Sequence, residues 1–389
     1  MKTGLSAKAD VEKTKSGKKR KWIITTVIIV ILIVSVFAVG ASVLNKVAPN
    51  GKVFKSIVKS IPGVENKLKG EEEGRINVVL LGMRGKGVTG GGTLADTIMV
   101  LSIKIDKDET GKDVYKAALV SIPRDLYVTV PGTTENHKIN EVYHYGEQKE
   151  EGGGLKAMKQ ILQDITGQPM HYAVQINFAG FKQIVDALGG VEVNLAEPFI
   201  EPVQFHEKRI CDGDKGGSFT VPTGEYQYKY NKRKTKVVKK YPYCYNKEEE
   251  CGGVFKVPAG VSILDGEKAL CYVRARVTSS DFDRARRQQE VIEQLKNKAL
   301  SIGVLTDFNK VQELLNAISG NFHTDMELWE MQRFFKLYQK MGDIKPVHKV
   351  LDNSEEGLLY SHEGDARGYI LMPRGDTYDR IRELFANII

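Results

Sequence analysis

The segment INVVLLG, residues 76–82, is the first of three apolar stretches that decide the fold. TIMVLSIKID at 97–106 and YKAALVSIPRD at 115–125 follow it closely. All three have the length of strands and are apolar enough to be covered on both faces. They predict successive strands of one buried sheet.

Helical segments follow these strands. GGLKAMKQILQDITG (153–167) and FAGFKQIVDALGG (178–190) have apolar residues at helical spacing and end in glycine, and MHYAVQIN (170–177) between them reads as another strand. Further on, ELWEMQRFFKLYQKM (327–341) is amphipathic, and residues 368–389 suggest a strand and a closing helix. Strands that alternate with helices predict a layered α/β domain.

The composition is that of a folded protein with an unusual distribution of charge. The chain has 389 residues, of which 41% are hydrophobic, enough for one large domain or two. Its formal net charge is +8, but residues 1–21 hold eight Lys and Arg against Asp10 and Glu12. The remainder is near +2, so bulk charge does not indicate nucleic-acid binding.

The basic tail, residues 1–21, precedes 24 uncharged residues, WIITTVIIVILIVSVFAVGASVLN, at 22–45. A helix of this length spans a bilayer core of about 30 Å. The flanking cations disfavour a buried core helix, and the length of the apolar run disfavours a cleaved signal peptide. We therefore expect a single-pass membrane anchor with a cytoplasmic tail, a stalk at 46–75 and the rest of the chain outside the cytoplasm.

Residues 204–258 interrupt the α/β pattern with Gly, Tyr and a basic run from Lys232 to Lys240. We interpret them as an extracytoplasmic insertion in the domain, not as a second domain. The basic run is either a solvated charge run, which we favour, or a surface for an anionic polymer or lipid headgroups.

The four cysteines fall in two places. Cys211, Cys244 and Cys251 lie in the insertion, whereas Cys271 lies in ALCYVRARV. If that segment is a strand, Cys271 and Val273 share its buried face and Cys271 is a core thiol. A disulfide among the other three suits an oxidising exterior, and the sequence leaves the pairing open. A metal site is disfavoured because no CxxC or clustered His accompanies them.

Two nucleotide-binding motifs fail in their context. GKGVTG, residues 85–90, matches GxGxxG and follows a predicted strand, but no helix opens after it. The P-loop pattern also fails, because Gly87 stands where Ser or Thr must hold Mg²⁺. What remains is a glycine-rich loop whose backbone N–H groups can approach an anion.

Arginines gather where the predicted elements begin or end. They are Arg124 at the end of a strand, Arg274 and Arg276 on one face of the strand expected around Cys271, and Arg284 and Arg287 in the first turns of the helix expected in DFDRARRQQEVI (281–292). Each alone is explained by a salt bridge with Asp125, Asp281 or Asp283. Together, five guanidinium groups against three acids leave buried charge uncompensated unless a multiply charged anion enters. Because planar bidentate donors suit phosphate oxygens, the pattern predicts a pyrophosphate or polyphosphate pocket.

Seven segments occur in order over residues 76–300 and together carry a resemblance. They are INVVLLG, ADTIMVLSI, ALVSIPRDLYV, HKINEVYHYG, FAGFKQIVDALGGVEVNL, LDGEKALCYVRAR and DFDRARRQQEVI. In this order they resemble the LytR-CpsA-Psr family of bacterial cell-wall glycopolymer ligases. The resemblance covers residues 76–300, with the insertion at 204–258, and leaves 301–389 as an extension packed on this domain or following it.

The resemblance implies a fold and a reaction. The fold is a three-layer α-β-α sandwich with a mixed central sheet, an apolar tunnel for a lipid, and arginines with Mg²⁺ over a pyrophosphate. The reaction transfers a glycopolymer from a polyprenyl-pyrophosphate carrier to a cell-wall hydroxyl, typically on peptidoglycan, and releases polyprenyl phosphate. Membrane, lipid-linked glycan and peptidoglycan are then the partners, and nucleic acid is not.

The motifs also imply site residues. Those implied as catalytic are Arg124, Arg274, Arg276, Arg284 and Arg287, those implied as substrate-binding are Lys138, Asn140 and Gln288, and Asp96 of ADT is implied as the metal ligand. Asp283 among the catalytic residues and Asp125 beside the substrate are candidate general bases, as is Asp281, for which a capping or salt-bridge role comes first.

Two positions depart from the family pattern. The family commonly has an aspartate where this chain has Arg84, and an arginine where it has Leu94. Loss of one carboxylate implies weaker Mg²⁺ binding, and Arg84 is expected to supply its own positive charge to the pyrophosphate. The departures leave two other functions open: a non-catalytic, membrane-anchored binder of lipid-linked wall polymer, and a hydrolase of the same pyrophosphate.

Overall fold

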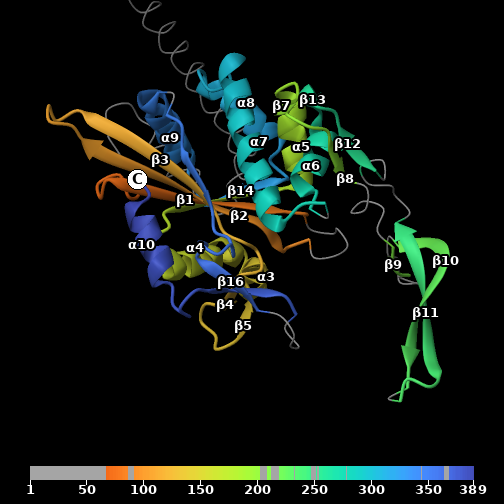
Figure 1. Cartoon of the computed structure of the whole chain (residues 1–389). Helices are drawn as coiled ribbons and strands as arrows, with labels where there is room; N and C mark the ends of the chain where they lie inside the picture. Colours follow the sequence, from red (N-terminus) through yellow and green to blue (C-terminus); the bar gives the residue numbers. More distant parts are fainter. Residues whose placement is uncertain are drawn as a thin grey trace, which may run out of the picture.

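Strand β1 (Arg75–Met83) lies inside a six-stranded sheet with the order β14-β6-β1-β2-β3-β15 (Figure 1). A computed structural model describes residues 67–85, 92–201, 208–211, 219–231, 233–246, 251, 254–276, 278–342, 344–362 and 368–389. The remaining strands of this sheet are β2 (Ala95–Lys107), β3 (Asp113–Ser121), β6 (Tyr172–Asn177), β14 (Phe322–Thr324) and β15 (Val347–Val350). β2 is antiparallel to β1 and β3, whereas β6 pairs parallel with β1 and β15 parallel with β3. The predicted mixed sheet is confirmed.

Three helices cover one face of this sheet. They are α3 (Ile139–Lys149), α4 (Gly153–Thr166) and α10 (Asp379–Asn387) (Figure 1). Val79, Leu81 and Val100 point to this face and are buried in one cluster with α4, because alternate residues of a strand share a face. α3 and α4 approach closely at Gly146, where an added Cβ would lie only 2.5 Å from the Gly153 carbonyl oxygen.

The opposite face is covered by α7 (Asp281–Ser301) and α9 (Leu328–Met341) (Figure 1). Buried Gln289 attaches α7 to the sheet, since its Nε2 donates to Ser121 Oγ at 2.8 Å and to the Lys349 carbonyl oxygen at 3.0 Å. On α9, Leu337 packs with Val78 and Tyr172. Helices therefore lie on both sides of the sheet, as a three-layer arrangement requires.

A second group of elements lies beside α7. It contains α5 (Phe178–Ala187), β7 (Val191–Leu195), β8 (Phe199–Glu201), β12 (Phe255–Val257), β13 (Gly260–Leu264), α6 (Gly266–Arg274) and α8 (Phe308–Ala317). The strand predicted in ALCYVRARV is wrong, because Asp265 caps a helix there by accepting from the Lys268 N–H. Five consecutive residues of α6, 269–273, are buried, so the alternation of apolar and polar residues at its end was misleading.

The insertion forms a separate small sheet. β9 (Arg209–Ile210), β10 (Phe219–Tyr230) and β11 (Val237–Asn246) pair in the order β10-β11-β9 and project away from the domain (Figure 1). A disulfide joins Cys211 to Cys244, as expected for the insertion, and a second joins Cys251 to Cys271. Cys271 is buried but is not a free core thiol, because α6 presents it to the end of the insertion.

Short strands complete the domain: β4 (Tyr127–Thr129), β5 (Asn136–Lys138), β16 (Leu359–His362) and β17 (Ile370–Pro373). The expected anchor at 22–45 and most of the expected stalk lie outside the described residues. Within the part of the chain that the structure describes, none of the helices has the length and apolar character to cross a bilayer.

Candidate active site

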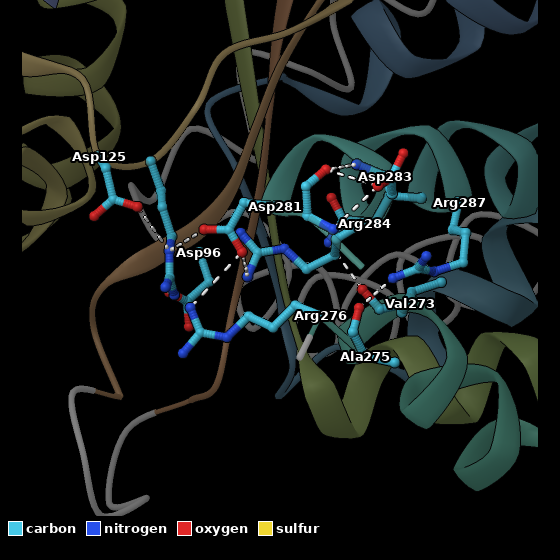
Figure 2. A network of polar contacts seen from close by, with 12 residues as sticks. Asp96, Asp125, Val273, Ala275, Arg276, Asp281, Asp283, Arg284 and Arg287 are labelled. Carbon is cyan, nitrogen blue, oxygen red and sulfur yellow. Dashed lines mark hydrogen bonds and ion pairs between the residues drawn. The ribbon is translucent and has the colours of Figure 1, made fainter. Parts of the chain in front are cut away.

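Cationic side chains converge on carboxylates where β2 begins and β3 ends, next to the first turn of α7 (Figure 2). The cationic cluster consists of Arg84, Arg124, Lys138, Arg276 and Arg284 together with Asp96, Asp125 and Asp281. These residues come from six separated segments of the chain: the ends of β1, β3 and β5, the start of β2, the residue pair after α6, and α7. The fold therefore brings together most of the predicted site.

Asp281 is the carboxylate with the most cationic neighbours. Its Oδ1 lies 3.2 Å from Arg284 Nη1 and 3.7 Å from Arg276 Nη1, and its Oδ2 lies 3.7 Å from Arg124 Nε. A salt-bridge role was expected for Asp281 ahead of a role as base, and the structure places it in three ion pairs. Ser280, not Asp281, is the N-cap of α7.

The other two carboxylates each contact Arg124. Asp96 Oδ1 accepts from Arg124 Nη1 at 2.7 Å, and Asp96 Oδ2 lies 3.7 Å from Arg84 Nε. Asp125 Oδ1 accepts from Lys138 Nζ at 2.7 Å, and Asp125 Oδ2 lies 3.5 Å from Arg124 Nε. Arg124 is thus at the centre of the cluster.

The cluster contains more positive than negative charge. Five cations face three carboxylates, and Arg284 is only 8% exposed. The Nε atom of Arg124 is buried without a hydrogen-bond partner in the described part of the chain, since its nearest carboxylate oxygens lie at 3.5 and 3.7 Å. An unsatisfied buried donor costs about 1–3 kcal/mol, and more when it is charged. An anion at this point would relieve that cost.

Burial and neighbouring charges change the pKa of two of these arginines in opposite directions. Burial is the main cause that lowers the pKa of Arg284 to about 10, opposed by the charge of Asp281 and assisted by those of Arg124 and Arg276. Burial also opposes the charge of Arg124, but the carboxylates of Asp96, Asp281 and Asp125 outweigh it and raise the pKa of Arg124. Both side chains are charged at neutral pH.

A cavity of about 240 Å³ opens beside the cluster. Its charged lining consists of Asp96, Arg124, Asp125, Asp281 and Arg284. Its apolar wall is formed by Ile98, Ile122, Phe282, Val350 and Leu371. A ligand with a charged head and an apolar tail fits this division.

Arg287 is directed away from the cluster, toward the C-terminal end of α6 (Figure 2). Gln288 also reaches that end of α6, although it lines the cavity as well. Arg287 Nε donates to the Tyr272 carbonyl oxygen at 3.0 Å and its Nη2 donates to that of Ala275, while Gln288 Nε2 donates to that of Val273 at 3.2 Å. The last carbonyls of a helix lack intrahelical partners and favour a cation. This pair therefore fixes α6 against α7, and burial lowers the pKa of Arg287.

Three further predicted residues lie at the edge of the cluster or outside it. Asp283 completes the capping box with Ser280 and contacts Arg286, and hydrogen bonds from Ser280 lower the pKa of its carboxyl. The Arg274 guanidinium lies over the ring of Phe178 at 4.8 Å. The backbone N–H of Asn140 donates to the Arg124 carbonyl oxygen, and its buried side-chain Oδ1 has no hydrogen-bond partner within the described ranges.

Sequence reasoning missed part of the cavity wall. Val350, Tyr369 and Leu371 come from the segment after residue 300, beyond the motifs. The alternation in GYILMP predicts the strand β17 there but gives no sign that it faces the site.

The family of the chain follows from a comparison with family models. The model of the LytR_cpsA_psr family matches residues 32–360. The chain belongs to this family. Its resemblance to the family, which rested on motifs between residues 76 and 300, is confirmed and extends into the C-terminal segment.

The chain is similar to the polyisoprenyl-teichoic acid–peptidoglycan teichoic acid transferase TagU of Enterococcus faecalis. The two are 26% identical over 324 residues, which cover 82% of this chain and 83% of that protein. The chain is 25% identical to TagU of Bacillus cereus, covering 86% and 90%. Its fold is similar to a solved structure of a chain described as a transcriptional regulator from Enterococcus faecalis, with a TM-score of 0.52, 20% identity and coverage of 82% and 89%. TagV of B. subtilis is similar with a TM-score of 0.50, 18% identity and coverage of 80% and 95%.

The Mg²⁺ that this family resemblance implies does not fit the residues at Asp96. Mg²⁺ is usually held by one or two carboxylates and phosphate oxygens. Here both oxygens of Asp96 lie against guanidinium groups, those of Arg124 and Arg84. In the part of the chain that the structure describes, no group of three acidic, His or Cys side chains is placed to hold a metal ion.

Proposed function

We propose that this chain transfers a glycopolymer from a polyprenyl-pyrophosphate carrier to a hydroxyl of peptidoglycan and releases polyprenyl phosphate. The observation that carries the proposal is a cluster of five cations and three carboxylates, two of whose arginines, Arg124 and Arg284, line a cavity that also has apolar side chains in its lining. A diphosphate headgroup matches the charge, and the start of a polyprenyl chain matches Ile98, Ile122 and Leu371. The names of the TagU relatives, which describe a transfer of teichoic acid to peptidoglycan, support the same reaction.

In this reaction one P–O bond forms and one P–O bond breaks. The acceptor oxygen attacks the phosphorus next to the polymer, and the bond from that phosphorus to the bridging oxygen breaks. The acceptor hydroxyl loses its proton, and polyprenyl phosphate leaves with the bridging oxygen. Such a transfer depends mainly on positioning and on neutralising charge on the phosphoryl oxygens, which guanidinium groups can supply.

The proposed roles follow from position. Arg124 and Arg284 contact the phosphates, because they are the most buried cations of the cluster and line the cavity. Arg84, Arg276 and Lys138 surround them and neutralise the outer oxygens. Arg287 and Gln288 are positioning residues that hold α7 on α6.

Asp281 and Asp125 are the candidate bases within the cluster, and both lie in ion pairs. Asp283 is held by Ser280 at the helix start and contacts Arg286, so we propose a structural role for it in place of catalysis. Asn140, whose buried Oδ1 lacks a partner among the described residues, is a candidate acceptor for a substrate hydroxyl.

The proposal places this domain outside the cytoplasm, attached to the membrane by the uncharged segment 22–45 with the basic tail inside. The two disulfides support an oxidising location. Labelling of cysteines introduced at positions before and after the segment, in intact cells with an impermeant reagent, tests this orientation.

The test of the activity uses the full chain in detergent with a lipid-linked glycopolymer and peptidoglycan. We expect a polymer–peptidoglycan product and an equal amount of polyprenyl phosphate, and both should form only when peptidoglycan is present. Release of polyprenyl phosphate without acceptor would instead identify a hydrolase. Intact lipid-linked polymer that stays bound, with no polyprenyl phosphate formed, would identify a binding protein.

A further inference from the structure

The insertion contains a ribbon of two long strands and one short strand that projects from the domain (Figure 1). We call its described residues, 208–211, 219–231 and 233–246, the basic ribbon. β10 and β11 pair antiparallel from Phe219↔Asn246 to Tyr230↔Val237, and Cys211–Cys244 joins β11 to the segment of β9. The ribbon is therefore a defined structural unit, although no layer of the main domain covers it.

The basic ribbon concentrates positive charge. Its cations are Lys208, Arg209, Lys229, Arg233, Lys234, Lys236, Lys239 and Lys240, and its one acid, Glu225, is paired with Lys208. The chain from residue 22 onward has a net charge near +2 only. The net positive charge of the ribbon is thus larger than that of the whole chain from residue 22 onward. The rest of that part of the chain therefore has a net negative charge.

The strand register places like charges opposite each other. Lys229 lies directly across from Lys239. Like charges at directly opposite positions destabilise an antiparallel pair. The next pair, Tyr228 and Lys240, belongs to the other face of the ribbon. An anion bound over Lys229 and Lys239 would convert this repulsion into attraction.

Tyrosines accompany the lysines on both faces. On one face, Lys240 Nζ lies 3.6 Å from the ring centroid of Tyr226, which is itself next to Tyr228. On the other face, Lys239 Nζ lies 4.8 Å from the ring centroid of Tyr241. Tyr228 is 48% exposed and Val238 is 57% exposed, so these side chains face solvent and do not pack in a core. Aromatic rings beside cations suit a ligand in which sugars or polyols alternate with phosphates.

We propose that the basic ribbon binds an anionic glycopolymer with repeating phosphodiesters. This inference rests on the proposed function, because the polymer is the non-lipid part of the same substrate. Charge complementarity favours it, since six of the eight cations lie between residues 229 and 240, around the turn that joins β10 to β11, with no acid among them. A flat membrane would contact one face of the ribbon only. Lysines and tyrosines lie on both faces, and a flexible polymer can contact both.

The test uses the full chain in neutral detergent and soluble poly(glycerol phosphate) as the probe. The variant is Lys229→Gln with Lys239→Gln, which removes the opposed pair. The matched control is Lys156→Gln with Lys268→Gln, two exposed lysines on helices of the domain. We expect the ribbon variant to bind the polymer about tenfold more weakly, with the slope of log K against log salt reduced by about 1 per lysine, and the control to bind as the wild type does.

Two results would overturn the proposal. One is equal polymer affinity in the ribbon variant and the control. The other is a wild type that binds vesicles of anionic lipid but not the polymer, together with a ribbon variant that no longer binds the vesicles.

A second assay separates this inference from the proposed transfer. With a short lipid-linked sugar that lacks repeating phosphates, the ribbon variant should transfer the sugar at the wild-type rate. A wild-type protein that binds the polymer but shows no transfer would contradict the proposed function and leave the inference about the ribbon intact.

Discussion

Asp281 and Arg284 lie one helical turn apart on α7, with 3.2 Å between Asp281 Oδ1 and Arg284 Nη1. The same carboxylate also approaches Arg124 and Arg276. One negative charge is thus shared by three guanidinium groups at the N-terminal end of a helix, which itself favours anions. The site is therefore arranged for a second, more highly charged anion.

Replacing Arg284 by Ala should abolish most of the transfer without unfolding the protein. Removal of one preorganised donor to a charged transition state costs about 10²–10³ in rate. Arg124→Ala should have at least the same effect, because Arg124 contacts all three carboxylates of the cluster. The measurement is acceptor-dependent product formation, with thermal unfolding of each variant as the test of folding.

Arg286→Ala is the matched control for this prediction. Arg286 lies on the same helix, is exposed and pairs with Asp283. It should leave transfer within about twofold of wild type, since an exposed pair contributes about 0–1 kcal/mol. Wild-type rates in both Arg284→Ala and Arg124→Ala would remove the proposed site.

Transfer should proceed in EDTA and should depend on Arg84. The Nε atom of Arg84, which stands where the family commonly has an aspartate, lies 3.7 Å from Asp96 Oδ2, so a carboxylate that could help to hold Mg²⁺ is replaced by a cation. Arg84→Ala should therefore reduce the rate in EDTA, and Arg84→Asp should restore part of it only when Mg²⁺ is added. Strict dependence on Mg²⁺ in the wild type, unaffected by Arg84→Ala, would contradict this assignment.

Affinity for a diphosphate should fall as the pH rises through about 10. Burial lowers the pKa of Arg284 to about 10, and the diphosphate binds the protonated form. The affinity should therefore keep its full value below this pH and fall above it by the contribution of Arg284, whereas Arg124, whose pKa is raised, stays charged. Binding of geranylgeranyl pyrophosphate from neutral pH to above 10 measures this, and Arg284→Ala should remove that step from the profile.

Much of the fold follows from local patterns. The long apolar strands and the helices that end in glycine, such as α4 before Gly167, match their predictions because period and cap agree. The segment around Cys271 differs, because five consecutive residues of α6, 269–273, are buried and leave no polar face there from which to read a period. Its N-cap, Asp265, was the available signal for a helix.

The site was predictable in its residue types but not in its geometry. The excess of arginine over acid in 281–287 indicated an anion site, and Arg284 lies in it. The same helical stripe did not reveal that Arg287 reaches the carbonyls of α6, because that contact depends on the crossing of two helices. Sequence spacing specifies a face, and only packing specifies the partner on that face.

Arg287→Ala should destabilise the protein more than it changes phosphate binding. The substitution leaves the carbonyl oxygens of Tyr272 and Ala275 buried without their donor, at about 1–3 kcal/mol for each group. Chemical unfolding should show this loss, and geranylgeranyl pyrophosphate affinity of the folded fraction should remain near wild type. Normal stability with lost diphosphate binding would return Arg287 to the phosphate site.

The two disulfides should differ in their effect on the domain. Cys251–Cys271 attaches the end of the insertion to α6, whose carbonyls Arg287 and Gln288 bind beside the cationic cluster. Cys251→Ser with Cys271→Ala should lower the free energy of unfolding by about 2–4 kcal/mol and weaken transfer.

Cys211→Ser with Cys244→Ser is the matched control. It should leave the main unfolding transition and the transfer of a short lipid-linked sugar unchanged, because that bond joins strands of the ribbon only. Equal loss of stability in both double variants would show that the ribbon supports the domain and is not a separate unit.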